Sequence, residues 1–280
     1  MKTIKRAALA LSLAAMAGPA LAAPRPWLKP APGRHAYRYA VTETVNGGFQ
    51  QGYRTDFDFV VGRDGAIDAL VMAAEESRDG KTWTRVAVPA DCLTKLNPPK
   101  GGLATARMWP LPPDVAKTMD SRFLDACAPP GIFFPITDIL NVAVIPTSGR
   151  FGVEKLKKAG DTAAYPAFTA HFDRAGETLT ETAHGGEVKL VSLDRRTAVI
   201  DWSPAPADLD LTEHPSPGQT VNLSGTEHWA FRLEFDARTG ALLRARTTYD
   251  DLDLKVKLDG VPADKAPRVA IKRSVTIEPR

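Results

Sequence analysis

"WAFRLEFDARTGALLRARTTYDDLDLKVKL", residues 229–258, is the stretch that decides the fold. Its first part sets large apolar side chains at every second position: Trp229, Phe231, Leu233 and Phe235. Mostly polar or charged residues fill the positions between them. This period of two is typical of a strand with one buried face and one solvated face. A turn signal, "RTG" at 238–240, follows, so the stretch predicts two antiparallel strands joined by a tight turn.

The end of the same stretch, "YDDLDLKVKLDG" at 249–260, sets four aspartates and two lysines among apolar residues. As a strand, residues 250–258 direct Leu252, Leu254, Val256 and Leu258 to one face, and Asp251, Asp253, Lys255 and Lys257 to the other. Carboxylates two positions apart lie about 7 Å from each other. Calcium loops also require a glycine at a sharp bend, and none precedes Gly260. We therefore predict an exposed strand face and no metal site.

Turn signals recur along the chain and favour antiparallel β structure. They are "NGG" (46–48), "RDG" (63–65), "RDGK" (78–81), "HGG" (184–186), "LDRR" (193–196), "RTG" (238–240) and "LDG" (258–260). Residues 53–61 alternate as well, with Tyr53, Thr55, Phe57, Phe59 and Val61 on one face. The predicted fold class is therefore mainly β, with antiparallel sheets arranged either as one system or as two half-barrel lobes.

The middle of the chain breaks this rhythm with proline clusters and one helix candidate. Residues 114–127 place apolar side chains four positions apart, and Pro129 forces a stop. The sequence thus predicts a signal peptide (1–22), a first antiparallel β region (23–88), a helical, proline-rich connector (89–160) and a second antiparallel β region (161–280).

Cys92 and Cys127 are the only cysteines of the chain. In an oxidising compartment an isolated pair most often forms a disulfide. Closure of this ring would contribute roughly 4 kcal/mol. Two free thiols would suit a cytosolic chain, and the absence of Cys-x-x-Cys spacing argues against a redox-active pair. We expect a disulfide that joins the predicted helix to the end of the first β region.

The N-terminus has the layout of a secretory signal peptide. Basic residues within positions 1–6 precede an apolar run over 7–17, and small residues precede a predicted cleavage between Ala22 and Ala23. The run is shorter than the about 20 residues that cross a hydrocarbon core. The sequence therefore predicts an exported protein, periplasmic or secreted, with no integral membrane segment.

The charge of the predicted mature chain is close to zero. The full sequence carries a formal net charge of +3, and the leader alone supplies three basic residues. Binding to nucleic acid or to an anionic membrane needs net or clustered positive charge. The sequence contains no such run, so we expect no nucleic-acid partner.

Catalytic, metal and cofactor motifs are absent from the sequence. Its five histidines, His35, His171, His184, His214 and His228, show no zinc-ligand spacing. No G-x-S-x-G elbow and no Gly-rich phosphate loop flanked by a strand and a helix occur. We predict no cofactor, no metal and no catalytic residue.

Two charged residues interrupt apolar strand faces. Glu43 shares a face with Tyr37, Tyr39, Val41 and Val45, and Arg273 with Ile271, Val275 and Ile277. One hypothesis is that they line a polar spot inside a ligand cavity or pair with each other. The alternative places both near frayed edges or bulges, where charges are tolerated.

The leader, the hairpin rhythm and residues 229–258 resemble those of uncharacterised exported bacterial β-sheet proteins. The pattern is also distantly similar to the lipoprotein-carrier and sigma-factor-regulator half-barrels of the periplasm. The resemblance implies binding, on a concave sheet lined by Tyr37, Tyr39, Phe57, Phe59, Trp229 and Phe231. It supplies no catalytic or binding motif.

Three functions remain open from the sequence. The first is an exported, non-enzymatic binding protein for an apolar ligand or an envelope protein partner. The second is a periplasmic hydrolase whose site is assembled from distant residues, which a cluster of ionisable side chains would favour. The third is a structural or assembly protein of the envelope, which a broad exposed apolar patch would favour.

Overall fold

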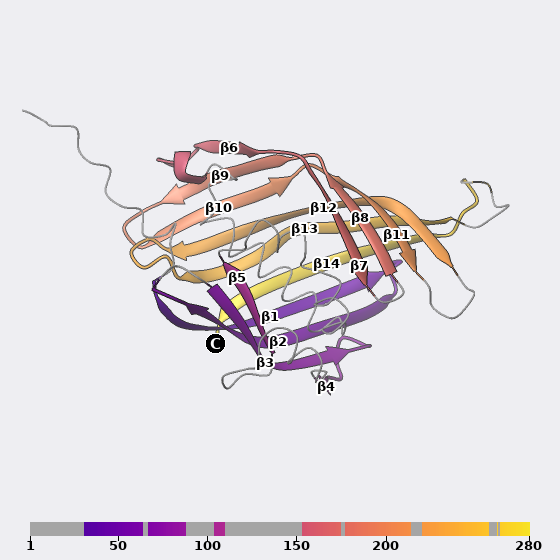
Figure 1. The fold of residues 1–280 in the computed structure, drawn as a ribbon, viewed down its shortest axis with the longest axis horizontal. Helices are drawn as coiled ribbons and strands as arrows, with labels where there is room; N and C mark the ends of the chain where they lie inside the picture. The colour runs from indigo at the N-terminus through magenta and orange to yellow at the C-terminus, as the bar shows by residue number, and fades with distance from the viewer. Residues whose placement is uncertain are drawn as a thin grey trace, which may run out of the picture.

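The chain forms a large antiparallel β-sheet, which confirms the predicted fold class (Figure 1). The computed structural model describes residues 31–63, 67–87, 104–109, 153–174, 177–213, 220–257, 262 and 264–280. Every strand pair within these residues is antiparallel. No α-helix occurs among them.

The described residues contain fourteen strands and one short 3-10 helix. Their bounds are β1 Gly33–Val45, β2 Phe49–Val61, β3 Ile67–Ser77, β4 Thr84–Val86, β5 Ala104–Trp109, η3 Val153–Lys155, β6 Thr162–Tyr165, β7 Phe168–Arg174, β8 Glu177–Ala183, β9 Gly186–Leu193, β10 Thr197–Pro204, β11 Ala207–Glu213, β12 Val221–Asp236, β13 Leu242–Lys257 and β14 Arg268–Pro279.

One sheet contains strands from both predicted β regions. Its main order is β4-β3-β2-β1-β14-β13-β12-β10-β9-β6. The first and last strands along the chain, β1 and β14, are neighbours in the centre of this order, and Val41 lies opposite Val275. The β1–β14 pair is therefore the seam at which the two halves of the chain meet.

The sheet divides at β12. The last part of β12 pairs with β10, whereas its first part pairs with β11, which continues to β8 and β7. Close to this division Gly225 approaches β13 so tightly that an added Cβ would meet the backbone carbonyl of Asp253. A residue without a side chain is needed where two backbones come this close.

Several predicted turns join strands as the sequence indicates. Asn46 and Gly47, with φ of 49° and 73°, form the turn between β1 and β2. Gly240, with φ of 71°, ends the turn between β12 and β13. Positive φ carries little steric cost for glycine, and asparagine tolerates it better than most residues, which explains their use here.

One face of the sheet is buried, and it carries the apolar residues that alternation predicts. Tyr39 and Phe57 are fully buried on β1 and β2, as are Ile200 and Leu233 on β10 and β12. A second group of leucines, Leu209, Leu223 and Leu254, packs near the division of the sheet. We call the side of the sheet that carries these residues the buried face, and the opposite side the outer face.

Several sequence predictions fall outside the described residues. They are the helix over 114–127, the cysteines Cys92 and Cys127, and the cleavage position between Ala22 and Ala23. Each stays a prediction. Within the described ranges, no helix has the length and hydropathy that a membrane span requires.

Candidate functional site: a buried arginine among three carboxyl groups

Arg273 is a cation on the buried face of β14, and three carboxyl groups surround it. Its Nε lies 3.8 Å from a carboxyl oxygen of Glu43 and 3.4 Å from Asp250, and its Nη1 lies 3.5 Å from Glu227. These partners come from β1, β13 and β12, so four strands contribute one residue each. We call Arg273, Glu43, Glu227 and Asp250 the charged cluster.

The register of the sheet brings the cluster together. Glu43 lies directly opposite Arg273 across the β1–β14 seam. Asp250 lies opposite Trp229, two positions from Glu227 on β12. Between Arg246 and Asp251 the pairing of β13 with β14 shifts, as at a β-bulge, close to Asp250. β-Bulges commonly change the direction in which nearby side chains point.

The cluster is removed from solvent. The exposed fraction of the Arg273 side chain is 12%, against 6% for Glu43, 3% for Asp250 and 18% for Glu227. Burying an ion costs several kcal/mol unless partners compensate for the lost hydration. Burying three carboxyl groups and one guanidinium on a mostly apolar face therefore lowers the stability of the fold unless their mutual attraction offsets the lost hydration.

Gln51 and Tyr53 on β2 border the cluster. The side-chain amide of Gln51 donates a hydrogen bond to Glu43, which lies opposite it in register. Burial, and secondarily the nearby carboxylates Glu43 and Glu76, raise the pKa of the Tyr53 phenol to about 12. The phenol is therefore a neutral group next to the cluster at physiological pH.

Two groups of aromatic rings lie on the same face. Tyr37, Phe57 and Phe59 contact one another with ring centroids 5.2–5.7 Å apart. Trp229 contacts Trp202 at 4.5 Å and Phe231 at 5.6 Å, and it is the residue opposite Asp250. Apolar walls with a few convergent polar groups are the usual composition of small-molecule sites.

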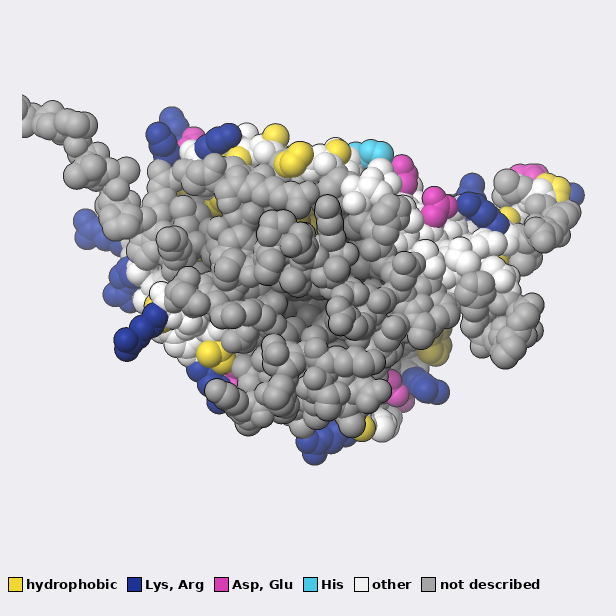
Figure 2. Space-filling view, viewed as in Figure 1, with side chains coloured by type: hydrophobic (Ala, Val, Ile, Leu, Met, Phe, Trp, Pro, Cys, Tyr) yellow, Lys and Arg dark blue, Asp and Glu magenta, His cyan; other side chains and the backbone are white. Residues whose placement is uncertain are grey.

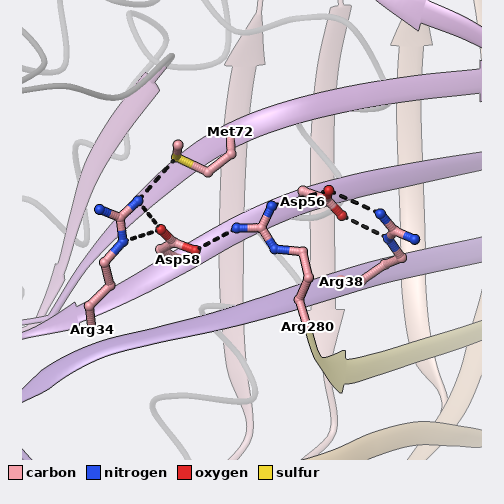
Figure 3. A network of polar contacts seen from close by, with 6 residues as sticks. All are labelled: Arg34, Arg38, Asp56, Asp58, Met72 and Arg280. Carbon is pink, nitrogen blue, oxygen red and sulfur yellow. Dashed lines mark hydrogen bonds and ion pairs between the residues drawn. The ribbon is translucent and has the colours of Figure 1, made fainter.

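The outer face of β1 and β2 carries a different charged arrangement (Figure 3). The Arg38 guanidinium donates two hydrogen bonds to Asp56, and Arg280 donates to Asp56 and Asp58 at 3.2 and 3.1 Å. Arg34 also contacts Asp58. We call these five residues the outer network. The hydrogen bonds from Arg38 are the main cause of a lowered Asp56 pKa.

The structure brings Glu43 and Arg273 together, as the pairing hypothesis requires. Neither residue lies at a sheet edge, because β1 and β14 have neighbours on both sides, so the frayed-edge part of the alternative is wrong. Arg273 does lie where the pairing of β13 with β14 shifts, which agrees with the bulge part of that alternative. Contact of the pair with a ligand stays a prediction. Sequence reasoning missed Asp250 and Glu227, although alternation places Asp250 with the leucines of β13 and Glu227 with the aromatic residues of β12.

Asp251 and Asp253 lie on the strand face that the sequence predicts, whereas Asp250 belongs to the charged cluster and Asp259 lies outside the described residues. Asp251 pairs with Lys272 and Asp253 with Arg268, across the β13–β14 pair. Among the described residues, no group of histidine, cysteine and acidic side chains is arranged to hold a metal ion. The side chains of His171 and His214 lie outside the described residues. His184 is exposed and contacts Asp208 at 2.8 Å.

Comparison with known proteins gives no match: no family model, no curated protein and no solved structure is similar to this chain.

Proposed function

We propose that the protein is an exported, non-enzymatic binding protein that holds an apolar molecule, or an apolar segment of an envelope protein, on the buried face of its sheet. The observation that supports this most is the charged cluster beside the aromatic residues. A sheet selected for stability alone would favour apolar residues there, because replacing a buried ion pair by apolar side chains is often neutral or stabilising. A ligand with an apolar body and a polar group would give the cluster a use.

The aromatic residues and the cluster have distinct tasks in this proposal. Trp229 and its neighbours contact the apolar body of the ligand, and the polar end lies near Glu227. Glu227 is the most exposed of the three carboxyl groups, so it is the first that a ligand would reach. Export, leader cleavage and the Cys92–Cys127 disulfide belong to the same proposal, because they set the compartment in which the ligand is met.

Native mass spectrometry of the protein from an exporting host tests this proposal. We expect a mass above that of the polypeptide, lost in Glu227→Gln and kept in Glu234→Gln. Glu234 is a matched control because it lies on the same strand. The same spectrum gives the cleavage position and the thiol state. A clean polypeptide mass, or an adduct that both variants keep, would count against binding at the cluster.

A hydrolase is the second candidate, and the same convergence of ionisable side chains supports it. Arg273 holds all three carboxyl groups in ion pairs, which suits a structural or binding role better than proton transfer. Turnover of chromogenic esters or glycosides by the wild type, reduced in Glu227→Gln but not in Glu234→Gln, would favour the hydrolase.

A structural role in the envelope has less support. Among the described residues the exposed large apolar side chains are Phe49, Leu193, Leu243 and Tyr249. Phe49 lies at the β1–β2 turn, whereas Leu193 and Leu243 lie near the opposite ends of the central strands. These positions do not form the one broad patch that an assembly surface would need.

A further inference from the structure

Three turns that are far apart in the sequence lie at one end of the sheet. The turn over 156–161 is joined to β9 by the Gly160 N–H, which donates to the Leu190 carbonyl at 2.8 Å. The turn after β9 is joined to the turn after β12, because the Ala237 N–H donates to the Arg196 carbonyl at 2.8 Å. The turn over 156–161 thus lies beside β9, the turns after β9 and β12 contact each other, and all three lie at the same end of the sheet.

Each turn exposes basic residues. Together they are Lys157, Lys158, Arg195, Arg196 and Arg238, all of them exposed, and we call this set the basic rim. Figure 2 shows Lys and Arg side chains, in dark blue, along the end of the molecule where these turns lie (left in Figures 1 and 2). The sequence contains no basic run of this size, so the fold assembles it.

The acidic residues of these turns are engaged with the backbone. Asp161 accepts hydrogen bonds from the N–H groups of Lys157 and Lys158, at 2.6 and 2.9 Å. Asp194 accepts from Arg196 and Thr197, and Asp236 accepts in the same way from the N–H groups of 238 and 239.

The three aspartates therefore fix the turns, while the basic side chains remain at the surface. Five cations face three carboxylates, which leaves a surplus of two positive charges on the three turns.

Two exposed leucines border the basic rim. Leu193, 36% exposed, is the last residue of β9, and Leu243, 39% exposed, follows the turn after β12. Basic residues beside exposed apolar ones are the combination that membrane-surface binding uses, with electrostatic attraction to anionic lipids and burial of apolar area. An acidic protein surface would require the cations but not the leucines.

The chain also enters the described structure at this rim. The Ala31 N–H donates to the Thr239 carbonyl at 3.0 Å, in the turn after β12. The predicted leader, 1–22, is therefore joined to the molecule here by eight residues, 23–30. Eight extended residues reach about 28 Å at most. A precursor whose leader is still in the membrane would hold this end of the sheet next to the lipid surface.

We propose that the basic rim docks the protein on an anionic lipid bilayer. Each basic residue near such a surface contributes about 1 kcal/mol to binding, and salt screens the attraction within a Debye length. In this orientation the long axes of the central strands point away from the bilayer. The docking does not depend on the ligand proposed above, so either proposal can fail without the other.

Vesicle co-sedimentation of the mature protein tests this docking. We expect binding to vesicles of phosphatidylglycerol and phosphatidylcholine in equal amounts, little binding to phosphatidylcholine alone, and release by high salt. Lys158→Glu/Arg195→Glu/Arg238→Glu, one substitution in each turn, should lower the partition coefficient about tenfold or more. The glutamine version of the same three substitutions should show a smaller loss in the same direction.

The matched control reverses the same number of charges elsewhere. Lys81→Glu/Lys255→Glu/Lys265→Glu uses three exposed lysines that lie outside the basic rim, and it should bind nearly as well as the wild type. Circular dichroism confirms that each variant is folded. Equal losses in the rim and control variants, no binding of the wild type to anionic vesicles, or binding to a DNA duplex without binding to vesicles would each overturn the proposal.

Discussion

The charged cluster and the outer network use the same chemistry, ion pairs between arginine and carboxyl groups, on opposite faces of one sheet. In the outer network three arginines share two aspartates, and solvent reaches the guanidinium groups, with Arg34 58% and Arg280 36% exposed. In the charged cluster one arginine faces three carboxyl groups, and Arg273 is 12% exposed. Exposed ion pairs contribute little to the free energy of unfolding, and their groups lose little hydration when they form. Buried ones cost several kcal/mol in lost hydration, so their retention calls for a reason beyond stability.

The largest expected loss of stability comes from removing the cation of the charged cluster. Arg273→Met keeps the length of the side chain but leaves three carboxyl groups on the buried face without their cation. We expect a loss of about 3–5 kcal/mol in the free energy of unfolding, measured by urea titration. Arg232→Met is the control, because Arg232 makes two 2.7 Å hydrogen bonds to Asp201 on the outer face. It should lose about 1 kcal/mol or less.

A variant with the whole cluster neutralised separates charge from packing. Adding Glu43→Gln, Glu227→Gln and Asp250→Asn to Arg273→Met removes the uncompensated carboxylates, so it should recover part of the lost stability. Equal losses for Arg273→Met and Arg232→Met would show that the two faces do not differ energetically, which would remove the main support for a functional cluster.

An intermediate loss of stability is expected at Asp58, because its carboxylate is buried like those of the charged cluster while its arginine partners are exposed. It belongs to the outer network, yet it is 1% exposed beneath Arg34 and Arg280. Asp58→Asn keeps an acceptor and removes the charge, while the arginines can still reach water. We expect a loss of about 1–2 kcal/mol in urea unfolding. A loss as large as that of Arg273→Met would show that burial of the carboxylate, and not exposure of the cation, sets the cost.

Much of this contrast could be anticipated from the sequence. Alternation at 53–61 and 229–235 predicts the buried face, and alternation at 37–45 and 271–277 marks Glu43 and Arg273 as charges that interrupt apolar faces. The register that puts Glu43 opposite Arg273 could not be derived, because the pairing of the first and last strands depends on the whole sheet. Alternation alone places Asp250 with the leucines of β13, but its meeting with Arg273 depends on how β13 pairs with β12 and β14, which the sequence does not give.

The basic rim shows the same limit for charge. Lys157, Arg195 and Arg238 are tens of residues apart, and the near-zero net charge of the mature chain gives no sign that they meet. Turn chemistry predicts each turn separately. Only the order β6-β9-β10-β12 brings the turns to one end of the sheet.

The smallest expected effect concerns the exposed part of the outer network and its pH dependence. The pKa of Asp56 is lowered chiefly by the hydrogen bonds from Arg38. A carboxyl group with a lowered pKa in the folded state contributes stability above its unfolded value, near 3.9, and loses it as the pH falls through the folded pKa. Arg38→Ala should therefore lower stability at pH 7 by about 1 kcal/mol or less, because the Arg38 side chain is 56% exposed and water screens the pair.

The difference between Arg38→Ala and the wild type should vanish in acid, once Asp56 is protonated in both proteins. Carboxyl titration followed by NMR should show the Asp56 pKa rising toward its ordinary value in Arg38→Ala. High salt should shrink the stability difference at pH 7, whereas the deficit of Arg273→Met should persist in salt because its site is buried. If salt shrinks the stability deficits of Arg38→Ala and Arg273→Met by the same amount, solvent reaches the charged cluster. The two faces would then not differ in how strongly solvent screens their charges.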